Sequence, residues 1–152
     1  MESSEVILII EKLISTVEKL IPEFTENPAD RNVSNGNAAI CIIDDKGNLH
    51  GKLFGTDKIR SRQSFKIAWT KASQVWITGM KTSEYEKAVF NNQVDEHKFG
   101  IMRPDFVGWE GGQPLALNNG TKLYAGFSGF RAFRDAEIVA KAFALVKSGK
   151  EM

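Results

Sequence analysis

The sequence has 152 residues, of which 42% are hydrophobic and 26% are charged, as in ordinary globular proteins and unlike disordered chains. Lysine and arginine number 20 against 19 aspartate and glutamate residues, and this near balance argues against a nucleic-acid or anionic-membrane partner. The length suits a single domain over residues 1–152.

The N-terminal segment predicts an amphipathic helix that Pro22 ends. Its apolar residues follow the helical period from Val6 to Leu20. We expect a structural helix laid on a sheet, and its aliphatic first turn also suits a subunit interface. The acidic residues Glu2 and Glu5 replace the basic region of a signal peptide, and the apolar run is too short to span a membrane. A cytoplasmic protein is therefore predicted.

The next segments predict a loop and then a hairpin. Residues 27–37 are rich in proline, asparagine and glycine, which favours a polar loop. Residues 38–43 form an apolar run typical of a strand covered on both faces, in which Cys41 is expected to be a buried apolar residue. The turn residues 44–48 then predict an antiparallel return over 49–54.

The middle of the chain predicts two helices between irregular segments. Residues 56–64 are basic and are interpreted as a loop, either solvated or anion-binding. Apolar spacing predicts a buried helix over 65–80, where Lys71 is expected to extend to solvent, the alternative being a catalytic amine. A further helix begins at Thr82 or Ser83, and residues 91–98 are interpreted as an exposed loop, the alternative being a lid.

The last part of the chain predicts a second hairpin and a final helix. Strands at 115–117 and 121–127 flank Asn118-Asn119-Gly120, a turn expected to need positive φ at both central residues. The final helix is expected over 136–146. Helix, hairpin, two helices, hairpin and helix make an α+β sandwich with a mainly antiparallel sheet and flanking helices.

An ordered set of short motifs resembles the GlcG/HbpS-like family over about residues 36–146. The motifs are Glu110-Gly111-Gly112-x-Pro114, Gly126-x-Ser128-Gly129, Asp135 with the helix after it, Ala68-x-x-Lys71-Ala72, and Thr82-x-x-Tyr85-Glu86. The family motif that usually precedes the helix is absent from residues 56–64. The resemblance implies a profilin-like fold, a homo-oligomer, and a ligand such as haem, which some family members bind.

The convergent polar groups lie near the second hairpin. Glu110, beside Trp109 and two glycines, is either an acid or base in a partly apolar setting or a structural carboxylate. Arg131 and Arg134 are spaced to grip a carboxylate or a haem propionate. Ser128 precedes a helix and could present backbone amides to an anion. Asp135 is expected to cap the last helix or to pair with an arginine.

Three functional hypotheses remain open from the sequence. The first is an oligomeric protein that binds haem or a related flat ligand, with His50 and His97 as axial candidates and Arg134 and Ser128 beside them. The second is a cofactor-independent lyase, isomerase or hydrolase acting on a small organic acid or carbonyl compound, with catalytic Glu110, Arg131 and Lys71. The third is an accessory subunit without a ligand. Two histidines are too few for a histidine-built metal site.

Overall fold

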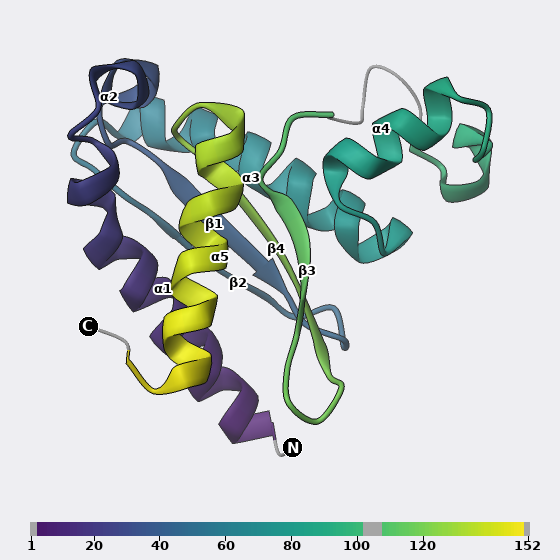
Figure 1. Ribbon diagram of the computed structural model, residues 1–152, viewed down its shortest axis with the longest axis horizontal. Coiled ribbons are helices and arrows are strands. Elements are labelled where there is room, and N and C mark those ends of the chain that lie inside the picture. Colours follow the sequence, from purple (N-terminus) through teal and green to yellow (C-terminus); the bar gives the residue numbers. More distant parts are fainter. Residues whose placement is uncertain (1–2, 102–107, 151–152) are drawn as a thin grey trace.

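A computed structural model describes residues 3–101 and 108–150 of the chain (Figure 1). Its elements, in order, are α1 (Ser3–Phe24), α2 (Pro28–Ser34), β1 (Ala39–Ile43), β2 (Leu49–Leu53), α3 (Lys58–Thr78), α4 (Thr82–Phe90), the 3₁₀ helix η1 (Glu96–Phe99), β3 (Gly112–Ala116), β4 (Lys122–Ser128) and α5 (Ala132–Ser148). The expected order of helices and hairpins is confirmed, with α2 and η1 as additions.

The four strands form one antiparallel sheet in the order β2-β1-β4-β3. The two predicted hairpins supply its outer pairs, and β1 joins β4 in the middle, where Ile40 lies opposite Phe127. Helices α1 and α5 lie side by side across one face, and α3 covers the other (Figure 1). The predicted α+β sandwich is therefore confirmed.

Strand β1 separates two hydrophobic cores. Ile40 and Ile42 pack into the core beneath α1 and α5, whereas Cys41 faces Ala68 and Ala72 of α3. All five residues of the strand are buried, because both faces of the sheet are covered. Cys41 is buried as expected, and burial raises the pKa of its thiol to about 11. The thiol is therefore a packing group.

The predicted polar loop over residues 27–37 was wrong, because most of it forms α2. The side chain of Asn27 accepts a hydrogen bond from Ala29 N–H, and Pro28 occupies the first helical turn. Asn35 ends the helix in the left-handed conformation. An asparagine cap followed by proline is a recognised helix start, so this signal was present in the sequence.

Two helix boundaries also differ from prediction. Helix α3 begins at Lys58, so most of the expected loop over 56–64 is helical, and Asp57 caps it by accepting from Arg60 N–H. Helix α1 continues through Pro22 to Phe24. Pro22 lacks an N–H and so removes one backbone hydrogen bond from the last turn, but the helix continues to Phe24, which is buried against Phe130.

The second hairpin is confirmed, but its turn is of another kind. Within residues 118–121, all of them described, only Gly120 has positive φ, at 87°. Gly120 N–H donates to Leu117 O, and Leu117 N–H donates to Thr121 O. Gly120 is therefore the last residue of the four-residue turn that begins at Leu117, and the two asparagines are its central residues.

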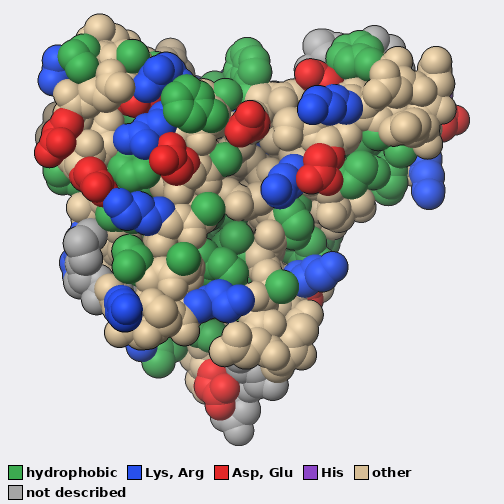
Figure 2. Space-filling view, viewed as in Figure 1, with side chains coloured by type: hydrophobic (Ala, Val, Ile, Leu, Met, Phe, Trp, Pro, Cys, Tyr) green, Lys and Arg blue, Asp and Glu red, His purple; other side chains and the backbone are tan. Residues whose placement is uncertain are grey.

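Lysine and arginine side chains alternate with acidic ones on the face that carries α1 and α5 (Figure 2). Several of these charges are paired across elements, as Lys141 with Glu23 and Lys52 with Glu18. This face therefore has no extended area of one charge.

Among the described residues, no helix is long and apolar enough to cross a bilayer.

Candidate functional site

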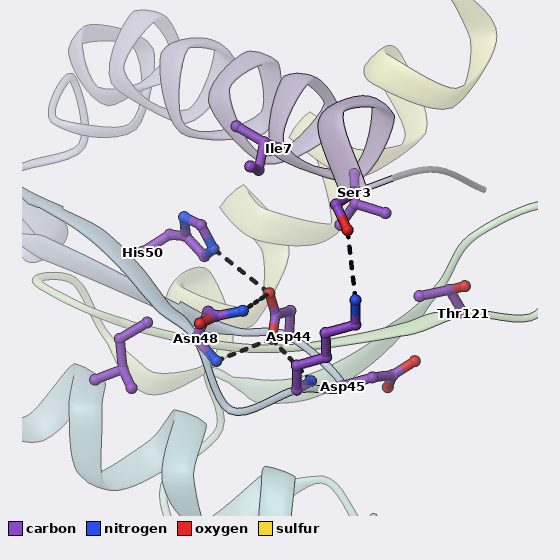
Figure 3. A pocket seen from close by; sticks show the side chains of 10 residues that line it. Ser3, Ile7, Asp44, Asp45, Asn48, His50 and Thr121 are labelled. Carbon is purple, nitrogen blue, oxygen red and sulfur yellow. Dashed lines mark hydrogen bonds and ion pairs between the residues drawn. The ribbon is translucent and has the colours of Figure 1, made fainter.

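A cleft of about 530 Å³ lies between the first turns of α1 and the turn that joins β1 to β2 (Figure 3). Val6 and Ile7 of α1 supply an apolar wall, and Ile7 is 44% exposed. The opposite side is polar. The lining residues are Ser3, Val6, Ile7, Asp44, Asp45, Lys46, Asn48, Leu49, His50 and Thr121.

Asp44 holds the turn at the polar side of this cleft. Its Oδ1 accepts from the backbone N–H groups of Lys46 and Asn48, each at 2.9 Å, and its Oδ2 accepts from Asn48 Nδ2 at 3.0 Å. Partial burial raises the pKa of Asp44, but these hydrogen bonds outweigh that effect and bring the pKa below its usual value. The carboxylate is therefore ionised at neutral pH.

His50, on β2, points its ring toward Asp44 (Figure 3). Its Nε2 lies 3.7 Å from Asp44 Oδ2, is shielded from solvent, and has no hydrogen-bond partner. The side chain as a whole is 25% exposed, so the rest of the ring remains accessible. Histidine nitrogens are common axial ligands of haem iron, and a cleft of this size is within the range of small-ligand pockets.

The second predicted axial candidate, His97, lies elsewhere. It is an exposed residue of η1, and its backbone N–H donates to the side chain of Asp95. No pocket residue of the His50 cleft comes from η1. The structure therefore does not bring the two histidines together. Residues 102–107, further along the chain, lie outside the described residues.

Lys71 and Asp135 form a buried ion pair between α3 and α5. Lys71 Nζ donates to Asp135 Oδ2 at 3.1 Å and to the carbonyl of Phe127 at 2.9 Å, and Asp135 Oδ1 accepts from Phe130 N–H at 2.8 Å. The side chains are 1% and 4% exposed. The expectation that Lys71 extends to solvent was wrong, as was an Asp135–arginine pair, because α3 packs Lys71 directly under the end of β4.

Burial shifts both groups of this pair. It raises the pKa of Asp135 to about 7, and the charge of Lys71 lowers it only in part. It also lowers the pKa of Lys71, against the opposing effect of Asp135. Burial therefore disfavours the charged form of both members of the pair, and their mutual attraction opposes it.

Gly111 and Gly112 cover this pair without side chains of their own. A Cβ on Gly111 would lie 2.7 Å from Lys71 Nζ, and one on Gly112 would lie 2.5 Å from Thr82 Cγ2. The two glycines also form part of a second cleft of about 260 Å³ that contains Glu110, Lys81 and Ser83. Glu110 is exposed, so the partly apolar setting expected for an acid or base is not present.

Arg131 and Arg134 both approach the buried carboxylate of Asp30 in α2. Arg131 Nε and Nη2 donate at 2.9 and 3.0 Å, and Arg134 Nε lies 3.3 Å away. The hydrogen bonds from Arg131 are the largest effect on Asp30 and hold its pKa below the usual range. The two arginines that were expected to bind the carboxylate of a ligand therefore bind the carboxylate of Asp30 within the chain. The sequence analysis missed this partner because α2 was interpreted as a loop.

Ser128 ends β4 on the side of α3 and is 7% exposed. The amides expected to bind an anion there are engaged by the chain, since Phe130 N–H donates to Asp135. The carbonyl of Gly129 accepts from the Ser34 hydroxyl at 2.8 Å. These contacts join β4, α2 and α5 rather than leave an open anion site.

Three solved structures share this architecture. Protein ORFY of Klebsiella pneumoniae, a DUF336 protein, superposes with a TM-score of 0.67 and 19% identity over 93% of this chain and 89% of its own. A PduOC–haem complex gives a TM-score of 0.61 and 15% identity over 95% and 93% of the two chains. An HbpS variant of Streptomyces reticuli gives a TM-score of 0.59 and 16% identity over 88% of this chain and 83% of its own.

The chain has the GlcG/HbpS-like fold. The resemblance found in the sequence is confirmed at the level of fold. No protein-family model and no curated protein matches the sequence. Within this fold, the described residues contain no cluster of three or more histidine, cysteine or acidic side chains arranged to hold a metal ion.

Proposed function

We propose that this GlcG/HbpS-like chain is a small-ligand-binding protein, and that the cleft between α1 and the β1–β2 turn holds haem with His50 as an axial ligand. The single observation that carries the proposal is the position of His50 at the edge of an open cleft with an apolar wall, where its shielded Nε2 faces an ionised carboxylate and other atoms of its side chain are accessible. The haem bound in the PduOC complex, a protein of the same fold, supports it by analogy.

The residues of the cleft fit haem chemically. Val6 and Ile7 can pack against a flat apolar ring, and Lys46, whose ammonium group lies 3.4 Å from Ser3 Oγ, places a positive charge at the rim for a propionate. Haem would supply a redox-active iron. The chain itself would bind and orient the ring and shield one side of it from water.

A titration with hemin tests this proposal. Wild-type protein should give a saturable, shifted Soret band with one binding site. We expect His50→Ala to weaken binding at least tenfold, because the axial ligand is lost, whereas His97→Ala should stay within threefold of wild type as the matched control. Non-saturating absorbance, or equal losses in both variants, would contradict the assignment.

The enzymatic alternative rests on the second cleft, where Glu110 is exposed beside Lys81 and Ser83. A cofactor-independent reaction on a small carboxylate or carbonyl compound would use Glu110 as acid or base. Both expected clamp residues, Arg131 and Arg134, are engaged by Asp30, which weakens this alternative. Turnover that is lost in Glu110→Gln and kept in His50→Ala would favour it over haem binding.

A homo-oligomer and a cytoplasmic location are part of the same proposal. Ile7 and Leu8 of α1 are 44% and 51% exposed, and Leu49 and Leu53 of the edge strand β2 are 56% and 50% exposed. Apolar side chains on a helix and a neighbouring sheet edge suit burial by a second subunit. The mass of the purified protein in solution, measured by light scattering, tests the oligomer.

A further inference from the structure

Asp44 and His50 lie on either side of one hairpin turn, and the two carboxylate oxygens of Asp44 make different contacts. Oδ1 is saturated by two backbone N–H groups of the turn, from Lys46 and Asn48. Among the described residues, Oδ2 accepts a hydrogen bond from the Asn48 side-chain amide alone, and it faces His50 Nε2. A carboxylate oxygen has two lone pairs, so Oδ2 can accept one more hydrogen bond.

The turn holds this carboxylate rigidly before any ligand arrives. Three hydrogen bonds of 2.9 to 3.0 Å fix its plane, whereas no described residue makes a hydrogen bond to His50 Nε2. The separation of 3.7 Å between His50 Nε2 and Asp44 Oδ2 is too long for a hydrogen bond, so the imidazole has to rotate toward the carboxylate to make one. The carboxylate is therefore the fixed partner, and the imidazole is the part that adjusts.

We infer that Asp44 is a positioning residue for His50: it accepts the Nε2 hydrogen and so leaves the Nδ1 lone pair free to bind the ligand of the cleft. The inference rests on the proposed function and deepens it, because it names the ligating atom and the group that orients it. Histidines that bind metals commonly donate their other ring N–H to a carboxylate, which sets the tautomer and makes the ligand more basic.

The geometry around the ring agrees with this division of roles. The second ring nitrogen lies on the side of the imidazole away from Asp44, and Ile7 of α1 lies across the cleft from the turn (Figure 3). Nε2 is the buried nitrogen, and the 25% exposure of the side chain belongs to the remainder. Asp45, next in the chain after Asp44, extends away from His50 and does not face the ring (Figure 3).

The first test uses the protein without haem. Long-range ¹H–¹⁵N correlation spectra of the imidazoles distinguish the two tautomers, and His97→Ala identifies which signals belong to His50. We expect the Nε2–H tautomer to predominate in wild type and in Asp45→Asn, which removes the same charge beside the turn. Asp44→Asn should shift the population toward Nδ1–H. An unchanged tautomer in Asp44→Asn would overturn the inference.

The second test measures hemin affinity by the Soret band in the same variants. Loss of such an orienting partner typically weakens metal binding about 10- to 100-fold. We expect that loss in Asp44→Asn and a smaller one in Asp45→Asn, which removes a charge from the cleft wall but leaves the carboxylate that faces His50. Equal affinities of these two variants would contradict a positioning role. If wild type fails to bind hemin, the proposed function fails, while the tautomer result still decides whether Asp44 orients the ring.

Asp44 also holds the turn, so Asn48→Ala separates the two effects. This variant removes the Asn48 Nδ2 hydrogen bond and leaves the carboxylate facing His50. It should keep the wild-type tautomer and weaken hemin binding less than Asp44→Asn does. A loss in Asn48→Ala as large as that in Asp44→Asn would show that turn stability, rather than the carboxylate, governs the site, and would overturn the inference.

Discussion

The His50 cleft and the Lys71–Asp135 pair join a nitrogen base to a carboxylate by opposite routes. Asp44 and His50 are close in sequence and meet across one turn, partly exposed to solvent. Lys71 and Asp135 are 64 residues apart and meet where α3, β4 and α5 converge, almost fully buried. The first arrangement leaves an accessible ring beside a cleft, whereas in the second both side chains are packed in the interior, out of contact with solvent.

This difference separates function from stability in the molecule. A charged group at the surface is solvated, so losing its partner costs little. A buried charge without a partner is far more costly, because water cannot replace the lost interaction. We therefore expect changes at the His50 cleft to alter ligand binding, and changes at the buried pair to alter folding.

The largest effect should come from breaking the buried pair. Lys71→Met leaves Asp135 without its ammonium partner and should lower the free energy of unfolding by about 3–5 kcal/mol, measured by urea denaturation. Lys141→Met, which breaks the exposed pair with Glu23, is the matched control and should cost less than about 1 kcal/mol. Similar losses in the two variants would remove the distinction between the regions.

The pH dependence of stability should identify Asp135 without changing Lys71. Burial raises the pKa of the Asp135 carboxyl to about 7 in the folded protein, above the 3.8 of an exposed aspartate, so the folded state binds the extra proton between these values. The free energy of unfolding should therefore fall as the pH rises from about 4 to about 7, by about 3 kcal/mol. Asp135→Asn should abolish most of this fall. A rise over the window would mean that Lys71 holds the carboxylate ionised.

A smaller effect is expected from the glycine that covers the pair. Gly111→Ala combines a positive φ of 119° with a Cβ placed against Lys71 Nζ, and should cost about 2–3 kcal/mol by thermal or urea denaturation. Gly120→Ala also has positive φ, 87°, but its Cβ would meet open space, so about 1 kcal/mol is expected. Equal costs would show that backbone strain alone matters and that the close approach does not.

The candidate site shows the same division between local and distant information. His50 was predicted as a ligand from its chemistry, and its neighbour Asp44 was interpreted only as a turn residue. Asp30 was missed as the partner of Arg131, because the segment that contains it was expected to be a loop. An asparagine cap before Pro28 could have corrected that boundary, whereas no local pattern indicates a contact between α2 and α5.

The sequence by itself determined the elements and their order apart from α2 and η1, because helical periodicity, apolar runs and turn residues act over a few neighbouring positions. It therefore predicted two hairpins, an antiparallel sheet and flanking helices. Tertiary structure alone decided that Lys71 meets Asp135, that Gly111 covers them, and that α1 closes a cleft over His50. Such contacts depend on how distant elements pack, and burial then sets the charge and accessibility of each side chain.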